Sequence, residues 1–134
     1  MSNQKIIAVA GATGAQGGGL VRAILADPSG GFAVRALTRD PASPAAQALA
    51  AAGAEVVAAD LADPASVVRA FEGAYGAYCV TFFWNHMSPD KEREEARALA
   101  NAARQARLKH VVWSTLEDTR RWMDIDDRRM PTLM

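Results

Sequence analysis

Residues 5–17 read KIIAVAGATGAQG, a short apolar run followed by three glycines spaced three apart. The run at 5–10 predicts a strand buried on both faces of a parallel sheet. Gly11 permits a tight turn into a helix, Gly14 lets the backbone approach a pyrophosphate, and Gly17 lets the helix pack closely on the strand. Free N–H groups at the start of that helix can bind phosphate oxygens. The stretch therefore predicts a dinucleotide-binding turn, with a purely structural turn as the alternative.

Four more apolar runs follow, and the segments between them carry Ala, Leu, Arg and Glu at helical spacing. Strands that alternate with helices predict βαβ crossovers. We therefore expect an α/β fold, a Rossmann-type doubly wound parallel sheet of five strands in the order 3-2-1-4-5. The expected strands are 5–10, 33–38, 55–59, 77–81 and 110–114.

Three expected helices share one kind of start, because Ser43, Asp63 and Ser88 each place an N-cap oxygen before a proline. Two of the expected helix ends fall at glycines, Gly53 and Gly73, which adopt the left-handed conformation easily. These signals fix the expected boundaries of the helices between the strands.

The longest helix is expected over residues 89–107. Acidic residues lead this segment and arginines close it, which matches the helix dipole. Apolar residues at helical spacing predict its buried face. The expected core stripe is Ala96, Leu99, Ala100 and Ala103.

The pattern breaks after Ser114. Residues 1–115 are expected to form one NAD(P)-binding domain, and residues 116–134 a tail that begins a missing C-terminal substrate region. A doubly wound fold normally continues to a sixth strand, which we expect to be lacking. The outer edge of the fifth strand is then unpaired and a candidate for self-association.

The chain has 134 residues, with 15 lysines and arginines against 15 aspartates and glutamates. This balance creates no long-range field that would attract nucleic acid or an anionic membrane, so we expect neither partner. No apolar run approaches the roughly 20 residues that span a bilayer. Cys79 is the single cysteine, and the N-terminus lacks the pattern of a secretory signal. A cytoplasmic location is therefore expected.

The second expected strand ends in LTR at 37–39, where an NAD-specific site usually has an acid for the ribose hydroxyls. Arg39 instead offers a guanidinium that can pair with the 2′-phosphate of NADP, which predicts NADP(H) as the cofactor. The alternative is a solvated Arg39 with Asp40 bound to the ribose. At the tip of the third strand, Asp60 is placed to contact the adenine and Leu61 to cover its face. A loop-capping aspartate is the alternative there.

Four stretches make the chain similar to the NmrA-like family of atypical short-chain dehydrogenase/reductases, in particular to the branch of the redox sensor HSCARG. They are GATGAQG at 11–17, TRDP at 38–41, GAEVVAADLADP at 53–64 and VVWSTLED at 111–118. The resemblance covers the chain from about Lys5 onward. It implies an NADP(H)-binding protein that acts as a regulator more often than as an enzyme, with a protein partner or a homodimer.

The resemblance also implies roles for individual residues. The glycine turn would hold the pyrophosphate, Arg39 the 2′-phosphate, and residues 81–83 the ribose and nicotinamide. Ser43 stands where some relatives have a lysine that grips the 2′-phosphate, and Phe82 where some have asparagine, so a lower affinity is expected. The implied site residues are Gly11, Ala12, Thr13, Gly14, Ala15, Gln16, Gly17, Arg39, Asp60, Leu61, Thr81, Phe82 and Phe83.

Residues for catalysis are scarce. Short-chain dehydrogenases pass a proton through a Tyr-x-x-x-Lys pair, but Tyr75 and Tyr78 have no lysine four residues on, so no catalytic residue is assigned. Cys79, His86 and His110 lack metal-ligand spacing, and no metal site is expected. An inert core residue is the favoured interpretation of Cys79, and a redox thiol the alternative.

Two functions compete. The favoured one is a sensor, in which bound NADP(H) changes a surface that a partner recognises. The other is an NADPH-dependent reductase of quinone-like or carbonyl substrates, with direct hydride transfer. A truncated form that acts only through its exposed sheet edge is a third hypothesis.

Overall fold

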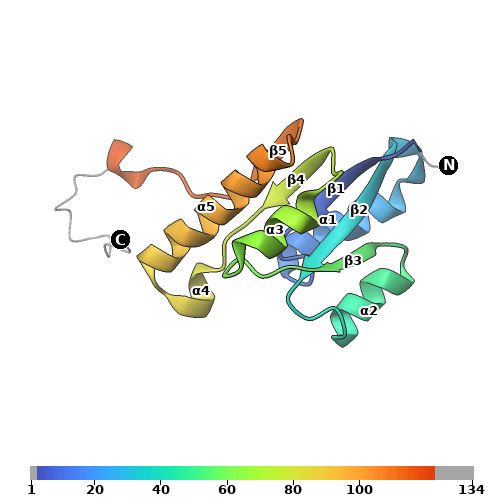
Figure 1. Cartoon of the computed structure of the whole chain (residues 1–134), viewed down its shortest axis with the longest axis horizontal. Coiled ribbons are helices and arrows are strands. Elements are labelled where there is room, and N and C mark those ends of the chain that lie inside the picture. Colours follow the sequence, from blue (N-terminus) through green and yellow to red (C-terminus); the bar gives the residue numbers. More distant parts are fainter. Residues whose placement is uncertain (1–2, 123–134) are drawn as a thin grey trace.

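The structure is a computed structural model and describes residues 3–122. Five parallel strands form one sheet in the order β3-β2-β1-β4-β5 (Figure 1). The predicted α/β fold and strand order are thus confirmed, and each strand ends within two residues of its expected end. The strands are β1 (Lys5–Val9), β2 (Phe32–Thr38), β3 (Glu55–Ala58), β4 (Gly76–Cys79) and β5 (His110–Trp113).

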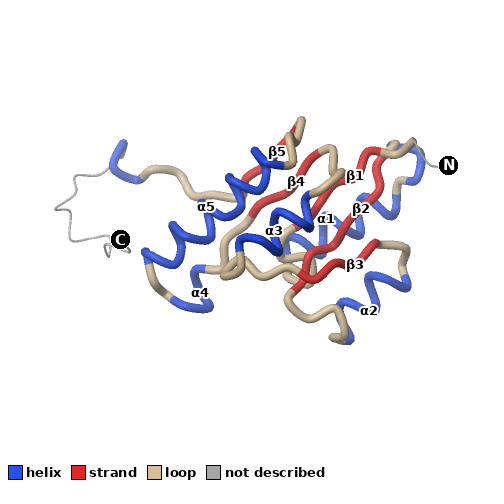
Figure 2. The backbone as a smooth tube through the Cα atoms, viewed as in Figure 1, coloured by secondary structure: helices blue, strands red, loops and turns tan. Residues whose placement is uncertain are grey.

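Helices connect successive strands and cover both faces of the sheet (Figure 2). Val21 of α1 and Leu49 of α2 pack in one core cluster, whereas Val67 of α3 and Leu99 of α5 pack in another. Within the described part of the chain, no helix is both long and apolar enough to cross a membrane. The helices are α1 (Ala15–Ala26), α2 (Pro44–Ala51), α3 (Pro64–Phe71), α4 (Phe83–His86) and α5 (Pro89–Gln105), with 3-10 turns at Pro28–Gly30 and Thr119–Arg121.

The order of the strands reverses at β1. Ile7 of β1 pairs with Val34 of β2 on one side and with Gly76 of β4 on the other. The connection from β1 through α1 runs to one side of β1, and the connection from β3 through α3 crosses back to β4 on the other side. In such sheets a crevice opens beyond the carboxyl ends of the strands at this point, and ligands usually bind there.

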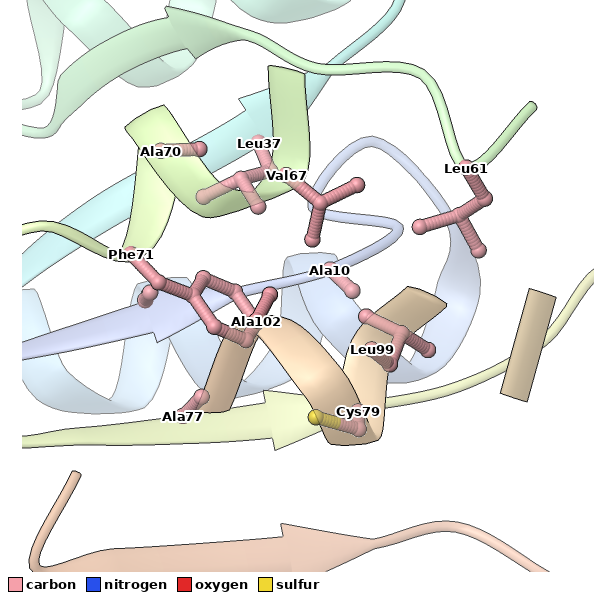
Figure 3. Close-up of a cluster of buried hydrophobic side chains, with 11 residues drawn as sticks. Ala10, Leu37, Leu61, Val67, Ala70, Phe71, Ala77, Cys79, Leu99 and Ala102 are labelled. Atoms are coloured by element: carbon pink, nitrogen blue, oxygen red, sulfur yellow. The ribbon is translucent and has the colours of Figure 1, made fainter. Parts of the chain in front are cut away.

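The larger core cluster lies between the sheet, α3 and α5. Side chains of these elements converge around Phe71, and Leu99 and Cys79 are likewise fully buried (Figure 3). Burial on both faces, expected for the strands, is reached in the second half of β1 but not in β5, where Val111 and Val112 are 41% and 49% exposed. β5 is the edge strand, so it has fewer neighbours to cover it.

Two of the three expected N-caps are confirmed. The Ser43 hydroxyl accepts a hydrogen bond from the Ala46 N–H (3.2 Å), and the Ser88 hydroxyl accepts one from Lys91 N–H (3.3 Å). The third prediction was wrong, because the Asp63 side chain makes no capping bond. The buried Ser66 hydroxyl bonds the Asp63 carbonyl instead (2.7 Å), so a residue inside α3 ties down its first turn.

The expected core stripe of α5 was wrong in part. Leu99 is buried as expected, but Ala100 is exposed, and Ala98 and Ala102 are buried in its place. The inner face therefore runs through 95, 98, 99, 102 and 106, with a glutamate at its first position. That glutamate broke the apolar pattern from which the stripe was predicted. The acids at the start of α5 thus do more than match its dipole.

The start of α1 lies against the end of β1 with no room for a side chain. A Cβ added to Gly17 would lie 2.2 Å from the carbonyl oxygen of Gly11 and 2.9 Å from that of Ala10. Both atoms belong to the backbone and cannot rotate away. At Gly19, one turn along, a Cβ would meet nothing within 4 Å. The predicted role of Gly17 in close packing is confirmed.

Gly17→Ala should therefore lower the free energy of unfolding by about 3 kcal/mol or more, because the helix must move away from the strand. Gly19→Ala is the matched control and should raise it by about 0.5–1 kcal/mol, since alanine favours the helix. Urea denaturation of the three chains measures both effects. Equal stability of Gly17→Ala and the parent chain would contradict the close packing.

Burial raises the pKa of the Cys79 thiol to about 11 from an ordinary value of 9.0. The folded chain then keeps this thiol neutral while the unfolded chain ionises it, so stability should fall as pH rises from about 9 to 11, by roughly 2–3 kcal/mol. Comparison with Cys79→Ala isolates this part of the pH dependence. In addition, iodoacetamide at about pH 8 should modify Cys79 quickly only in denaturant. Fast alkylation of the native chain would favour the redox-thiol alternative.

Candidate functional site

A cleft of about 450 Å³ opens beyond the carboxyl ends of β1 and β2, where the strand order reverses. Glycines of the turn form one wall, and the residues after β2 and β4 form the others. Six residues predicted for the site line it: Gly11, Thr13, Gly14, Arg39, Leu61 and Phe82.

The glycine turn is shaped by its neighbours. Gly11 has a φ of +59°, and a Cβ there would lie 3.1 Å from the Phe82 ring. Gly14 precedes α1 and has no side chain to cap it, and no acidic residue lies in the first turn. The first N–H groups of a helix have no partner within the helix and carry its positive dipole end. The turn can therefore receive an anionic group.

Arg39 follows β2 and reaches the same cleft. Its side chain is exposed and forms no ion pair or hydrogen bond with any residue in 3–122. The neighbouring carboxylate of Asp40 is partly occupied, because its Oδ1 accepts a hydrogen bond from the Ala42 N–H (3.0 Å). Asp40 also lines the cleft, so both alternatives for the ribose end remain spatially available.

Asp60 and Leu61 both line a hollow of about 280 Å³ that adjoins the cleft. Leu61 is buried and lines the cleft as well, whereas Asp60 does not. Asp60 Oδ1 accepts a hydrogen bond from the Ala62 N–H (2.9 Å). This bond is the geometry of a loop-capping aspartate, the alternative left open for this residue.

Two carboxylates of α5 hold the segment that follows β4. The Thr81 hydroxyl bonds Glu92, and the Phe82 N–H donates to Glu95 Oε2 (2.7 Å). The side chains of both glutamates are half-buried. The Phe82 ring is thereby set against Gly11, while Phe83 lies outside the cleft lining. The sequence did not indicate these glutamates as site residues, because acidic residues at the start of a helix are already explained by the helix dipole.

The remaining predicted residues do not line the cleft. Ala12 and Gly17 are buried beneath the turn, and Ala15 is exposed at the start of α1. Gln16 lines a separate, mainly apolar hollow of about 610 Å³. Its Oε1 accepts hydrogen bonds from the Tyr78 hydroxyl (2.5 Å) and the Ser114 hydroxyl (2.8 Å), so Gln16 links α1 to the ends of β4 and β5.

Some lining residues were not predicted. Most of them end a strand or begin a helix, and the strand ends alone could have suggested them, because ligands bind beyond the carboxyl ends of parallel strands. Asn85 had no such signal, since the sequence pattern did not indicate the short helix α4. The unpredicted lining residues are Ala10, Leu37, Thr38, Ser43, Ala59 and Asn85.

Comparison with known proteins agrees with this geometry. The NmrA-like family oxidoreductase FrzB of Cladobotryum sp. is 41% identical over 114 residues, which cover 82% of this chain and 33% of that protein. The chain thus spans about a third of the length of the curated relatives that it matches.

Solved structures share the fold. NmrA, a negative transcriptional regulator in complex with NAD, superposes with a TM-score of 0.75 at 28% identity, over 91% of this chain and 36% of that one. The NADPH-dependent quinone oxidoreductase QOR2 of Escherichia coli, complexed with NADPH, superposes with a TM-score of 0.66 at 30% identity, over 83% of this chain and 36% of that one. The model of the NmrA-like family matches residues 3–131, and the chain belongs to this family.

Proposed function

We propose that this chain is the NADP(H)-binding part of a redox sensor in the NmrA-like family. The observation that carries the proposal is the unpaired Arg39 guanidinium, which shares one cleft with the uncapped start of α1. A dinucleotide with a 2′-phosphate needs one site for its pyrophosphate and a second cationic site nearby. Both lie on the walls of this cleft.

We propose a wall of the cleft for each part of the nucleotide. The pyrophosphate would lie at the N–H groups after Gly14, and the 2′-phosphate against Arg39. Leu61 is buried at the cleft and offers an apolar surface for the adenine. The Phe82 ring lies against Gly11, on the side toward β4, where the nicotinamide would extend.

The solved relatives support the binding of a dinucleotide but do not decide whether it carries a 2′-phosphate. NmrA was solved with NAD and also with NADP, and QOR2 with NADPH. The selectivity proposed for this chain therefore rests on Arg39 itself. A carboxylate at this position would repel the 2′-phosphate, whereas a guanidinium pairs with it.

A sensor also needs a surface that responds to the bound nucleotide. Helix α4 directly follows Phe82 and presents Trp84 and Met87, which are 75% and 62% exposed. A change at the nicotinamide end would reach this surface through one turn of chain. We propose that the chain is of the HSCARG branch, that a protein partner or a second copy recognises this surface, and that the protein acts in the cytoplasm, where its free thiol would stay reduced.

A reductase is the second candidate, because the curated relatives are named oxidoreductases and QOR2 reduces quinones with NADPH. In such a protein, hydride would pass directly from the nicotinamide to a substrate in the same cleft. This activity would belong to a longer protein, since the present chain spans about a third of its relatives.

Calorimetric titration tests which nucleotide the chain prefers. The 134-residue chain should bind NADPH at least about tenfold more tightly than NADH, a difference of about 1.4 kcal/mol. Arg39→Ala should remove this preference, because NADH does not carry the 2′-phosphate that Arg39 contacts. Arg97→Ala, an exposed arginine of α5 outside the cleft lining, should keep it.

A further variant separates the two alternatives at the ribose. Asp40→Asn should leave NADPH binding unchanged if Arg39 holds the 2′-phosphate. If Asp40→Asn weakens the binding of NADH, and Arg39→Ala leaves the affinity for NADPH unchanged, then Asp40 bonds the ribose. That result would reject the proposed selectivity for NADP(H).

A turnover assay tests whether this chain alone can act as a reductase. With NADPH and a soluble quinone, this chain should bind the nucleotide without oxidising it faster than buffer does, which absorbance of NADPH would record. Steady oxidation that stops in Arg39→Ala would support the reductase instead.

A further inference from the structure

A second cluster of polar side chains lies beside the cleft, between α4 and α5. Helix α4 directly precedes α5 (Figure 1). His86 ends α4, and Glu92 and Glu95 stand one turn apart at the start of α5. One nitrogen or oxygen atom of each lies within 4.8 Å of the corresponding atoms of the other two. All three side chains are half-buried, which is unusual for carboxylates without a cationic partner.

The atoms that point into the cluster are free, and the others are already held. Glu92 Oε1 bonds the Thr81 hydroxyl and Glu95 Oε2 accepts from the Phe82 N–H, whereas Glu92 Oε2 is buried without a hydrogen-bond partner. His86 Nε2 is likewise buried without a hydrogen bond, although Glu95 Oε1 lies 3.2 Å away. In metal sites, outer hydrogen bonds of this kind orient the ligating carboxylates.

In the described part of the chain, the carboxylates of the cluster have no basic side chain bonded to them, although Arg39 and Lys91 line the hollow beside it. His86 Nδ1 accepts a hydrogen bond from the Ser88 N–H (3.0 Å), so the imidazole is neutral in this arrangement. No lysine or arginine among residues 3–122 forms an ion pair with Glu92 or Glu95. Two half-buried carboxylates therefore face one neutral ring, and a divalent cation would neutralise them.

We infer that His86, Glu92 and Glu95 bind a divalent transition-metal ion of the Zn²⁺ class. Two ligands at roughly 2.0–2.1 Å from a tetrahedral ion lie roughly 3.3 Å apart. The 3.2 Å between His86 Nε2 and Glu95 Oε1 matches this spacing. One imidazole and two carboxylates leave a fourth position for water, and the nitrogen ligand favours Zn²⁺ over the oxygen-seeking Mg²⁺ and Ca²⁺.

Metal binding changes one hydrogen bond in a defined way. Nε2 must give up its proton to bind the ion, and the neutral imidazole then carries a proton on Nδ1. Nδ1 can no longer accept from the Ser88 N–H, so that bond breaks. Three metal–ligand bonds replace it.

The spacing of cysteines and histidines along the chain gives no sign of this cluster, so no metal site was expected. The ligands of this cluster come from two helices, one of which was not predicted. The site would also lie close to the nucleotide cleft, since Phe82 and Asn85 line both the cleft and the adjoining hollow that contains His86 and Glu95. The inference does not depend on nucleotide binding and is tested without it.

Calorimetric titration of the chelator-treated 134-residue chain with Zn²⁺ alone is the test. One ion should bind per chain, and His86→Gln should weaken binding at least about tenfold, because loss even of an outer-shell partner has effects of that size. His110→Gln is the matched control, since His110 is the only other histidine and is exposed. Glu92→Gln should weaken binding similarly, whereas Glu117→Gln, an exposed glutamate that does not line the hollow, should not.

Two results would overturn the inference and show surface binding of Zn²⁺. One is unchanged affinity for Zn²⁺ in His86→Gln, and the other is a loss of affinity in His110→Gln as large as that in His86→Gln. NMR of the unmodified chain keeps the test independent of how the variants fold. The NMR signals of the His86 ring nitrogens and of the Ser88 amide should both shift as Zn²⁺ is added. Both shifts should be complete at one ion per chain. Unshifted signals at both residues would overturn the inference as well.

Discussion

The contact between Gly17 and the backbone of residues 10–11 is the constraint on which the rest of this structure depends. A side chain at Gly17 would meet a carbonyl oxygen at 2.2 Å, so only glycine lets α1 start directly against β1. That approach aims the N-terminal end of the helix at the place where the strand order reverses. The cleft follows from these two facts together. Arg39 and Phe82 then complete a site whose position the backbone has already determined.

The opposite wall of the cleft is held by hydrogen bonds to carboxylates rather than by close packing. Glu92 and Glu95 of α5 bond the Thr81 hydroxyl and the Phe82 N–H, and the Phe82 ring then fills the space above Gly11. Helix α5 is thereby coupled to the glycine turn through a single residue. The same two carboxylates face His86, so any ion or proton that they bind also acts on this wall. Local electrostatics and cleft geometry are therefore not independent in this protein.

The sequence predicted the features that depend on local chemistry and periodicity. The glycine spacing, the strand runs and the Ser-Pro starts each act over a few residues, and the strand order follows from the rules of parallel crossovers. The errors at Asp63 and Ala100 have another origin. Ser66 captures the Asp63 carbonyl, and the inner face of α5 includes Glu95, so tertiary contacts overrode local preference. A glutamate whose partner is a backbone N–H thirteen residues earlier gives no periodic signal.

The two tyrosines of this chain lie away from the cleft. The Tyr78 hydroxyl donates to Gln16, and the Lys5 ammonium lies 4.6 Å above the ring of Tyr75. Both line the apolar hollow beside α1 and not the cleft. Reduction of a carbonyl needs an acid within hydrogen-bond reach of the substrate oxygen, and neither phenol can supply it there. Both rings instead support contacts of α1 and β1 with the rest of the sheet.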